Sequence, residues 1–388
     1  MQLGGLPGAL LPRARFVMST RLHWWSIRLW LVYSSTLAAY AQTPVSEELG
    51  VLRGAQFRIL MPANWNRNLV LWCGGYRASP GTFQKGKTLG NFARALVEQG
   101  YAVAESGYSK GGVAVDQAFA DTHSLREHFM AKHPSTRAVY VVGESMGGLV
   151  SLTLVEAYPK SYKAGLSFCG LLASPFEFTR RAFDLLALFH YFQPEALPSP
   201  SAIPGDFRPS ETMFAAVAAS LDRSPLDAEL VRNQAGVNSN EELAQVLVFH
   251  TDLLRDLANA CGGNPFDNRS TIYVAGSRST AINDRLQRAS ASRVATECVK
   301  RMRTPRGNLL VPFLAVDSAS DPVVPAWFAN GYESALAGTP FAANFARQFV
   351  SGSGHCTIPL QTRLEAFQEL VTWASSPGAR PTPGLRRQ

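Results

Sequence analysis

The hydrophobic residues of this chain alternate between short continuous runs and longer segments with helical spacing. Asn68–Cys73 (NLVLWC) and Ala138–Val142 (AVYVV) are unbroken apolar runs of the kind that form buried parallel strands. Further strands are expected at Gln56–Met61, Tyr101–Glu105, Ala164–Cys169, Leu309–Val316 and Ala346–Val350. Helices are expected at Thr88–Glu98, Val113–Lys132, Met146–Tyr158, Ala326–Ala337 and Thr362–Ala374. This alternation predicts βαβ units and therefore an α/β protein with a mainly parallel sheet.

The alternation stops between about Leu171 and Arg306. Amphipathic helical patterns dominate this stretch, namely Phe178–Phe192, Glu211–Leu221 and Glu241–Ala260. Only Thr271–Val274 predicts a strand there. The stretch is therefore interpreted as a helical insertion and not as a second sheet domain.

The N-terminus has the pattern of a targeting segment. Basic residues precede an apolar stretch, Leu29–Ala41, and Ala39-Tyr40-Ala41 fits the small-x-small rule for a cleavage site. The stretch is about thirteen residues long, whereas a membrane span needs roughly 20. We expect a secreted or periplasmic protein with no stable membrane span after cleavage at Ala41. An uncleaved anchor and a start at Met18 stay open.

These patterns divide the chain into five parts. They are a signal peptide (1–41), the first part of the sheet core (42–170), the helical cap insertion (171–306), the second part of the core (307–376) and a flexible tail (377–388). The tail is rich in proline, glycine and arginine, a composition typical of loose ends.

Composition and charge exclude several classes of protein. Of the 388 residues, 46% are hydrophobic and 17% are charged, which is enough to bury a large core. The net charge of +8 comes almost wholly from four arginines in 1–41 and three in 377–388, which contain no acid, so the rest carries +1. A basic surface for nucleic acid is therefore not expected.

Five cysteines follow the predicted signal segment, so at least one must stay unpaired within the chain. Disulfides are allowed if the protein is exported. Cys261 and Cys298 fall in the same insertion and are the first candidates for a pair.

Residues 143–147 read Gly-Glu-Ser-Met-Gly, and the motif lies where a β-prone run meets a helix. A nucleophilic serine needs this setting, because a sharp turn must hold its hydroxyl above the sheet edge and glycines must avoid clashes in that turn. Ser145 is thus the candidate nucleophile. The alternative is a strand–helix turn in which the serine has no chemical role.

Of the seven histidines, His355 has the position that a catalytic base requires. It follows the last expected strand within Gly352-Ser353-Gly354-His355 and precedes the last helix. The other six lie in the signal segment, on expected helices or at a helix end, and His123 and His128 are spaced badly for sharing a metal.

The carboxylate that orients the base is expected between the serine and the histidine in chain order. Asp321 follows the next-to-last strand, in Asp-Pro-Val-Val-Pro, and is the preferred candidate. It would accept the Nδ1–H of His355 and stabilise the imidazolium. Asp317, which is closer to the strand end, stays open as the alternative.

Two backbone N–H groups are expected to stabilise the oxyanion. Met146 follows the nucleophile at a helix N-terminus, where free N–H groups and the helix dipole favour negative charge. The second donor is expected at Gly75 or Tyr76, in the glycine loop after the strand Asn68–Cys73. A glycine turn without a catalytic role is the alternative.

From about residue 50 to 376, these motifs together resemble the α/β-hydrolase superfamily, in its secreted esterase and prolyl-oligopeptidase-like branch. The resemblance implies a central sheet of about eight strands flanked by helices, a helical cap inserted after strand six, and acyl-enzyme chemistry with no metal and no organic cofactor. His355-Cys356 also resembles tannase-type and feruloyl esterases, which tie a cysteine after the histidine to one before the serine. Here Glu144 precedes Ser145, so that disulfide cannot form in the same way.

The expected function is hydrolysis of a carboxylic ester, small or oligomeric, through a Ser-His-Asp triad. The sequence shows no propeller domain and no evident acidic pair for binding an amine. A prolyl-oligopeptidase-like peptidase and a non-catalytic binding protein of the same fold are the alternatives. The sequence leaves the oligomeric state open.

Overall fold

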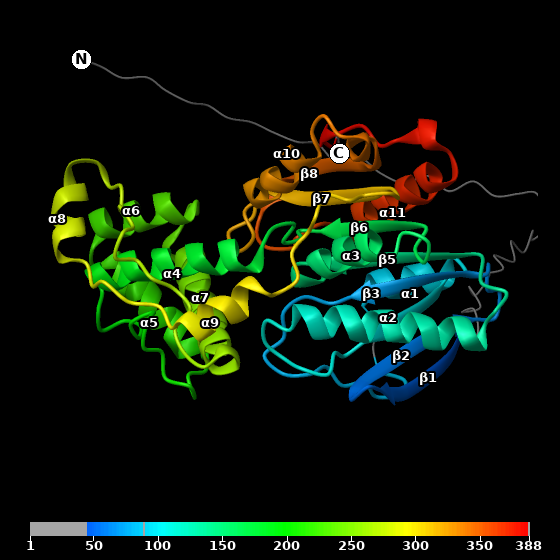
Figure 1. Ribbon diagram of the computed structural model, residues 1–388, viewed down its shortest axis with the longest axis horizontal. Helices are drawn as coiled ribbons and strands as arrows, with labels where there is room; N and C mark the ends of the chain where they lie inside the picture. Colours follow the sequence, from blue (N-terminus) through cyan, green and yellow to red (C-terminus); the bar gives the residue numbers. More distant parts are fainter. Residues whose placement is uncertain (1–44, 88–89, 387–388) are drawn as a thin grey trace, which may run out of the picture. The chain divides into compact units, whose positions relative to one another are not determined.

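The computed structural model describes residues 45–87 and 90–386. The predicted signal segment lies outside the described residues. Nine strands form one sheet in the order β1-β2-β4-β3-β5-β6-β7-β8-β9 (Figure 1). The strands are β1 (Val45–Leu52), β2 (Ala55–Pro62), β3 (Asn68–Cys73), β4 (Ala102–Ser106), β5 (Ala138–Glu144), β6 (Ala164–Phe168), β7 (Phe313–Ser320), β8 (Phe345–Ser353) and β9 (Gly384–Leu385).

The sheet is mostly parallel. Only β2 runs antiparallel to its neighbours, β1 and β4, and every pair from β4 to β9 is parallel. The predicted α/β architecture with a mainly parallel sheet is confirmed. The sequence pattern did not predict β1, because its residues are half exposed and lack a continuous apolar run.

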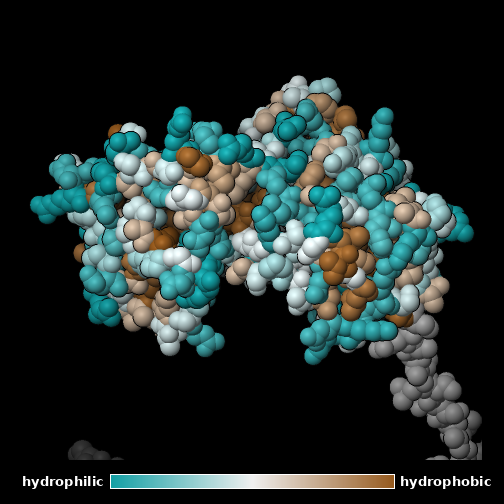
Figure 2. All heavy atoms as spheres, turned by 60° about the horizontal axis from the view of Figure 1, so that its bottom comes forward, coloured by the Kyte–Doolittle hydropathy of each residue, from teal (hydrophilic) through white to brown (hydrophobic). Residues whose placement is uncertain are grey.

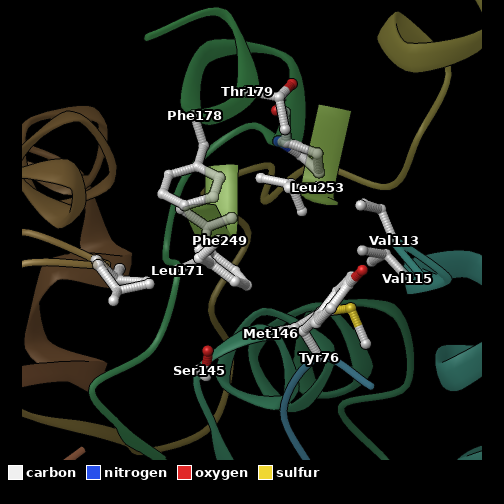
Figure 3. Close-up of a pocket in the computed structure, with 13 residues that line it drawn as sticks. Tyr76, Val113, Val115, Ser145, Met146, Leu171, Phe178, Thr179, Phe249 and Leu253 are labelled. Carbon is white, nitrogen blue, oxygen red and sulfur yellow. The ribbon is translucent and has the colours of Figure 1, made fainter. Parts of the chain in front are cut away.

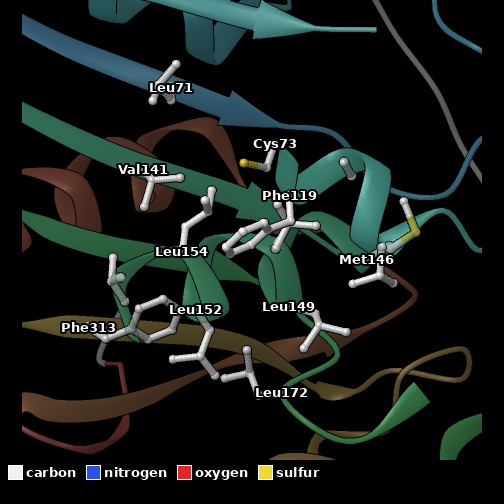
Figure 4. Close-up of a cluster of buried hydrophobic side chains, with 14 of the residues drawn as sticks. Leu71, Cys73, Phe119, Val141, Met146, Leu149, Leu152, Leu154, Leu172 and Phe313 are labelled. Carbon is white, nitrogen blue, oxygen red and sulfur yellow. The ribbon is translucent and has the colours of Figure 1, made fainter. Parts of the chain in front are cut away.

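Helices cover both faces of this sheet. The helices of the core are α1 (Asn91–Glu98), α2 (Val115–Lys132), α3 (Met146–Ala157), α10 (Asn330–Leu336) and α11 (Leu360–Ser375). On one face, Phe119 of α2 and Leu149 of α3 pack with Leu71 and Val141 of the central strands (Figure 4). On the other face, α1 and α11 bury their aromatic side chains against β5 and β6. This double cover explains why the central strands are apolar along their whole length.

Six helices are inserted between β6 and β7, as predicted for a cap after strand six. They are α4 (Pro175–Phe192), α5 (Glu211–Asp222), α6 (Pro225–Ala235), α7 (Asn240–Cys261), α8 (Ser279–Arg285) and α9 (Arg293–Lys300). They bury a hydrophobic core of their own. A disulfide joins Cys261 at the end of α7 to Cys298 in α9, which confirms the predicted pair.

The predicted strand Thr271–Val274 is wrong. The backbone N–H and C=O of Tyr273 bond to the side-chain amide of Asn283 instead of to a neighbouring strand. The apolar residues that suggested a strand, Ile272 and Val274, are exposed on the cap. Figure 2 shows a mostly hydrophilic surface on which hydrophobic residues gather in a few patches.

The last part of the chain contacts the sheet as far as Arg386. In the tail that the sequence predicted to be flexible, β9 pairs with β8, and the Arg386 N–H donates to the Phe349 carbonyl at 2.8 Å. The Arg386 guanidinium also binds Glu369 of α11. Among the helices that the structure describes, none is long and apolar enough to cross a membrane.

Candidate active site

Ser145 occupies a strained turn between β5 and α3. Its backbone has φ 54° and ψ −123°, a conformation that non-glycine residues rarely adopt and that costs of order 1–3 kcal/mol. A Cβ on Gly143 would overlap the carbonyl oxygen of Gly147, and a Cβ on Gly147 would overlap that of Cys73. Both glycines of the motif are therefore required for the turn to pack against the sheet. The predicted strand–turn–helix setting is present.

The structure brings the imidazole of His355 and the hydroxyl of Ser145 together. The Nε2 atom of His355 lies 2.9 Å from the Ser145 Oγ, although the two residues are 210 positions apart. The Nδ1 atom lies 2.8 Å from Oδ2 and 3.0 Å from Oδ1 of Asp321. An imidazole in this position can take a proton from the hydroxyl while the carboxylate holds its other nitrogen.

Two backbone N–H groups hold the Asp321 carboxylate in place. Asp321 directly follows β7, is only 4% exposed, and its Oδ1 accepts the backbone N–H groups of Val323 and Val324, both at 2.9 Å. These bonds set the orientation of the carboxylate.

Asp317, the alternative acid, is engaged elsewhere. It lies inside β7, and its Oδ2 accepts a hydrogen bond from Nε of Arg347 at 2.8 Å. Burial raises the pKa of Asp317 to about 6, against the lowering effect of the Arg347 charge. The carboxylate bonded to His355 is therefore that of Asp321. The strand continues past the predicted end at Val316, which is why Asp317 does not reach the sheet edge.

The three predicted oxyanion residues also lie beside the nucleophile. A Cβ on Gly75 would be 3.2 Å from the Cβ of Ser145, so the backbone of the loop Gly74–Tyr76 passes directly next to the serine. Met146 is the first residue of α3, where a backbone N–H has no acceptor within the helix. An oxyanion on Ser145 would face this helix end.

Tyr76 connects the loop Gly74–Tyr76 to the cap. Its hydroxyl bonds to Oδ2 of Asp252 at 3.0 Å and to Oδ2 of Asp256, both in α7. Burial and these two carboxylates raise the pKa of Tyr76 far above its usual value, so the hydroxyl stays a neutral donor. Arg255 binds both carboxylates as well. No pattern in the sequence indicates this contact, because it depends on how the cap packs on the core.

An apolar pocket opens next to Ser145, between the core and the cap (Figure 3). Phe178 of α4 and two residues of α7, Phe249 and Leu253, form part of its wall. Among the described residues, the polar ones that line it are Tyr76, Ser145 and Thr179. Such a pocket suits an uncharged, apolar part of a ligand.

A disulfide fixes the residue that follows His355. Cys356 is bonded to Cys169, the first residue after β6, and Cys73 is a buried free thiol. The cysteine after the histidine is thus paired, but with Cys169 at the end of β6 and not with the residue that directly precedes Ser145 in the sequence. In the described part of the chain, Cys169, His355 and Cys356 are the one group whose atoms are close enough to share a metal ion. Both sulfurs are bonded to each other, so neither is available as a thiolate ligand.

Comparison with known proteins gives one family match. Residues 77–199, which include Ser145 and the first cap helix, match the family described as serine aminopeptidase, S33. No curated protein sequence matches the chain.

Solved structures with a similar fold are diverse. A candidate dipeptidyl aminopeptidase IV from Bacteroides ovatus has 11% identity and a TM-score of 0.46, covering 86% of this chain and 36% of its own. An acylaminoacyl peptidase from Pyrococcus horikoshii has 9% identity and a TM-score of 0.45, covering 86% and 42%. A candidate lipase from Acinetobacter baumannii has 14% identity and a TM-score of 0.41, covering 86% and 92%. The chain thus spans less than half the length of these peptidases. Its sheet topology is that of an α/β-hydrolase fold, and the segment around the nucleophile turn resembles the family described as serine aminopeptidase, S33.

Proposed function

We propose that the protein hydrolyses carboxylic esters with an apolar acyl group, using Ser145 as nucleophile, His355 as base and Asp321 as the orienting acid. The observation that carries this proposal is the continuous chain of contacts from the Ser145 Oγ through His355 to Asp321 at the mouth of an apolar pocket.

In this mechanism His355 takes the hydroxyl proton of Ser145, and the Oγ attacks the ester carbonyl. The N–H groups of Met146 and of Gly75 or Tyr76 stabilise the oxyanion. His355 then gives the proton to the leaving alcohol, which leaves an acyl-enzyme on Ser145. Water, deprotonated by the same imidazole, releases the acid.

The pocket favours an ester over a peptide with a free amino terminus. Recognition of an ammonium group needs a free carboxylate, and no charged side chain lines the pocket. The nearest acidic pair in the cap, Asp252 and Asp256, binds Arg255 and the Tyr76 hydroxyl. An aminopeptidase remains the second candidate because of the family match over residues 77–199.

The test compares nitrophenyl esters of increasing acyl length with aminoacyl nitroanilides. We expect turnover of the esters, loss of turnover by roughly 10⁶-fold in S145A, and labelling of wild type but not of S145A by a fluorophosphonate. F178A should prefer longer acyl chains than wild type, because removal of the Phe178 ring enlarges the pocket. Normal turnover in S145A would overturn the mechanism. Preference for the nitroanilides would favour the aminopeptidase, and a folded, unreactive wild type would favour a binding protein.

We also propose that the protein is exported. Two disulfides, Cys169–Cys356 and Cys261–Cys298, support this proposal, because such bonds persist in oxidising compartments. N-terminal sequencing of the protein from fractionated cells tests it, with Gln42 as the expected first residue of an extracytoplasmic product. Recovery only from the reducing cytosol would overturn it.

A further inference from the structure

Arg363 makes an unusually complete set of hydrogen bonds near the start of α11. Its Nη1 donates to Oε2 of Glu144 at 3.0 Å, its Nη2 to the carbonyl of Cys356 at 2.9 Å, and its Nε to the carbonyl of Ile358 at 3.1 Å. The side chain is only 14% exposed. All three nitrogens of the guanidinium are therefore used, in a geometry that only the planar arginine fork can provide.

Two of these partners flank the reacting groups. Glu144 directly precedes Ser145, and Cys356 directly follows His355. One buried side chain thus holds both the turn that presents the hydroxyl and the loop that presents the imidazole.

A second contact ties Arg363 to the nucleophile turn. Its guanidinium lies over the ring of Phe168, 5.1 Å from the ring centre. The carbonyl of Phe168 accepts the backbone N–H of Ser145 at 3.1 Å. Arg363 therefore packs on the residue that anchors the serine, in addition to its ion pair with Glu144.

The loop before His355 offers little stiffness of its own. Gly352 and Gly354 have φ values of 139° and 109°, where glycine is favoured and backbone freedom is large. The Gly354 N–H donates to the carbonyl of Ser320 at 2.9 Å on this side of His355, so the position of the imidazole depends on this bond and, on the other side, on what holds Cys356. Its sulfur is bonded to Cys169, and its carbonyl is bonded to Arg363.

We propose that Arg363 is a positioning residue. It fastens the turn at Ser145 to the loop Gly354–Cys356 that carries His355 (the base loop), and so sets the separation between the Ser145 Oγ and the His355 Nε2. This role rests on the proposed function of that site. The ion pair with Glu144 holds the turn at Ser145, and the bonds to the carbonyls of Cys356 and Ile358 hold the chain after His355. The Cys169–Cys356 disulfide holds the end of the loop covalently.

The size of the effect follows from the need for a short proton-transfer distance. A displacement of about 1 Å in a reacting group lowers the rate by roughly 10²-fold. Lysine can pair with Glu144 as a point charge but cannot bind both carbonyls at the same time. We therefore expect R363M to lower kcat by roughly 10²-fold and R363K by roughly 10-fold. KM should stay unchanged, because Arg363 does not line the acyl pocket.

The matched control is R386M. Arg386 also forms an ion pair with α11, through Glu369, but binds no residue of the base loop. Wild type, R363K, R363M and R386M are compared for ester kcat and KM, for the rate of fluorophosphonate labelling, and for urea stability. R363A is assayed with and without low-millimolar guanidinium, which can occupy the vacated site and partly restore kcat.

The expected result is a loss of kcat and of labelling rate in the Arg363 variants alone, with recovery of R363A by guanidinium. An unchanged kcat in R363M, an equal loss of kcat in R386M, or no effect of guanidinium on folded R363A would overturn the positioning role. A wild type that hydrolyses no ester and takes no label would instead overturn the proposed function.

Discussion

Replacing Asp321 by asparagine is expected to put the proton of His355 on the wrong nitrogen. Oδ1 of Asp321 accepts the backbone N–H groups of Val323 and Val324 and lies 3.0 Å from Nδ1 of the imidazole, whereas Oδ2 lies closer to Nδ1, at 2.8 Å. Asparagine has one acceptor oxygen, which must stay with the two backbone donors. Its NH₂ group then faces Nδ1, so the imidazole carries its proton on Nε2 and cannot take one from Ser145.

The expected loss is large in activity and small in stability. A histidine held in the wrong tautomer by this substitution lowers kcat by roughly 10⁴-fold in serine proteases, which corresponds to about 5 kcal/mol in the barrier. Both backbone N–H groups keep an acceptor, so the free energy of unfolding should fall by only about 1–2 kcal/mol, the loss of one charge-assisted hydrogen bond.

The assay is ester kcat in D321N and D317N, alongside urea denaturation of both. D317N is the matched control, because Asp317 lies four residues away and binds Arg347 instead of the imidazole. It should retain kcat. If D321N kept kcat within about tenfold of wild type, or if D317N lost as much, the tautomer argument and the choice of Asp321 would both be wrong.

Three further predictions concern stability. Burial raises the pKa of Asp317 from 3.8 to about 6. Between these two pH values the folded protein keeps the proton on Asp317, whereas the unfolded chain releases it. Its contribution to the free energy of unfolding therefore falls as the pH rises from about 4 to 6, and urea titrations should show a flatter pH dependence in D317N; an unchanged slope would contradict this. The Cys261–Cys298 bond closes a separation of 37 residues, so C261A/C298A should lose about 3–4 kcal/mol by chain entropy, measured with urea, and a loss below about 1 kcal/mol would refute the estimate. G147A should give no folded protein by circular dichroism, because its methyl group would overlap a backbone carbonyl of β3; a folded, active G147A would show that the turn can relax.

Much of the candidate site could be predicted because its signals are local. The glycines around Ser145 follow from the shape of one turn, and their spacing is visible in five residues. The carboxyl ends of parallel strands meet at one sheet edge, so residues that follow β5, β7 and β8 are expected to lie together. Ser145, Asp321 and His355 follow these strands in that order, and the structure brings them within hydrogen-bonding distance.

The other contacts depend on packing that no local pattern contains. The choice between Asp317 and Asp321 is decided by where β7 ends, and a boundary error of four residues is enough to reverse it. Cys356 pairs with Cys169 because the fold brings the end of β6 next to the loop that carries His355, although the two cysteines are 187 positions apart in the sequence. Nothing in the sequence distinguishes Arg363 within the expected helix Thr362–Ala374, because only the fold shows that its guanidinium meets Glu144.

The cap illustrates how packing links two parts of the site that look independent in the sequence. One face of α7 carries four residues of the site, because three of them follow Phe249 at spacings of three, four and seven positions. These three are Asp252, Leu253 and Asp256. Phe249 and Leu253 line the acyl pocket, while the two aspartates bind the hydroxyl of Tyr76. Any movement of α7 that widened the pocket would also pull on the loop that carries the Gly75 and Tyr76 N–H groups. Access of the acyl group and the placement of the oxyanion donors are therefore coupled through a single helical face, and a substrate that fits the pocket without displacing α7 leaves those donors in place.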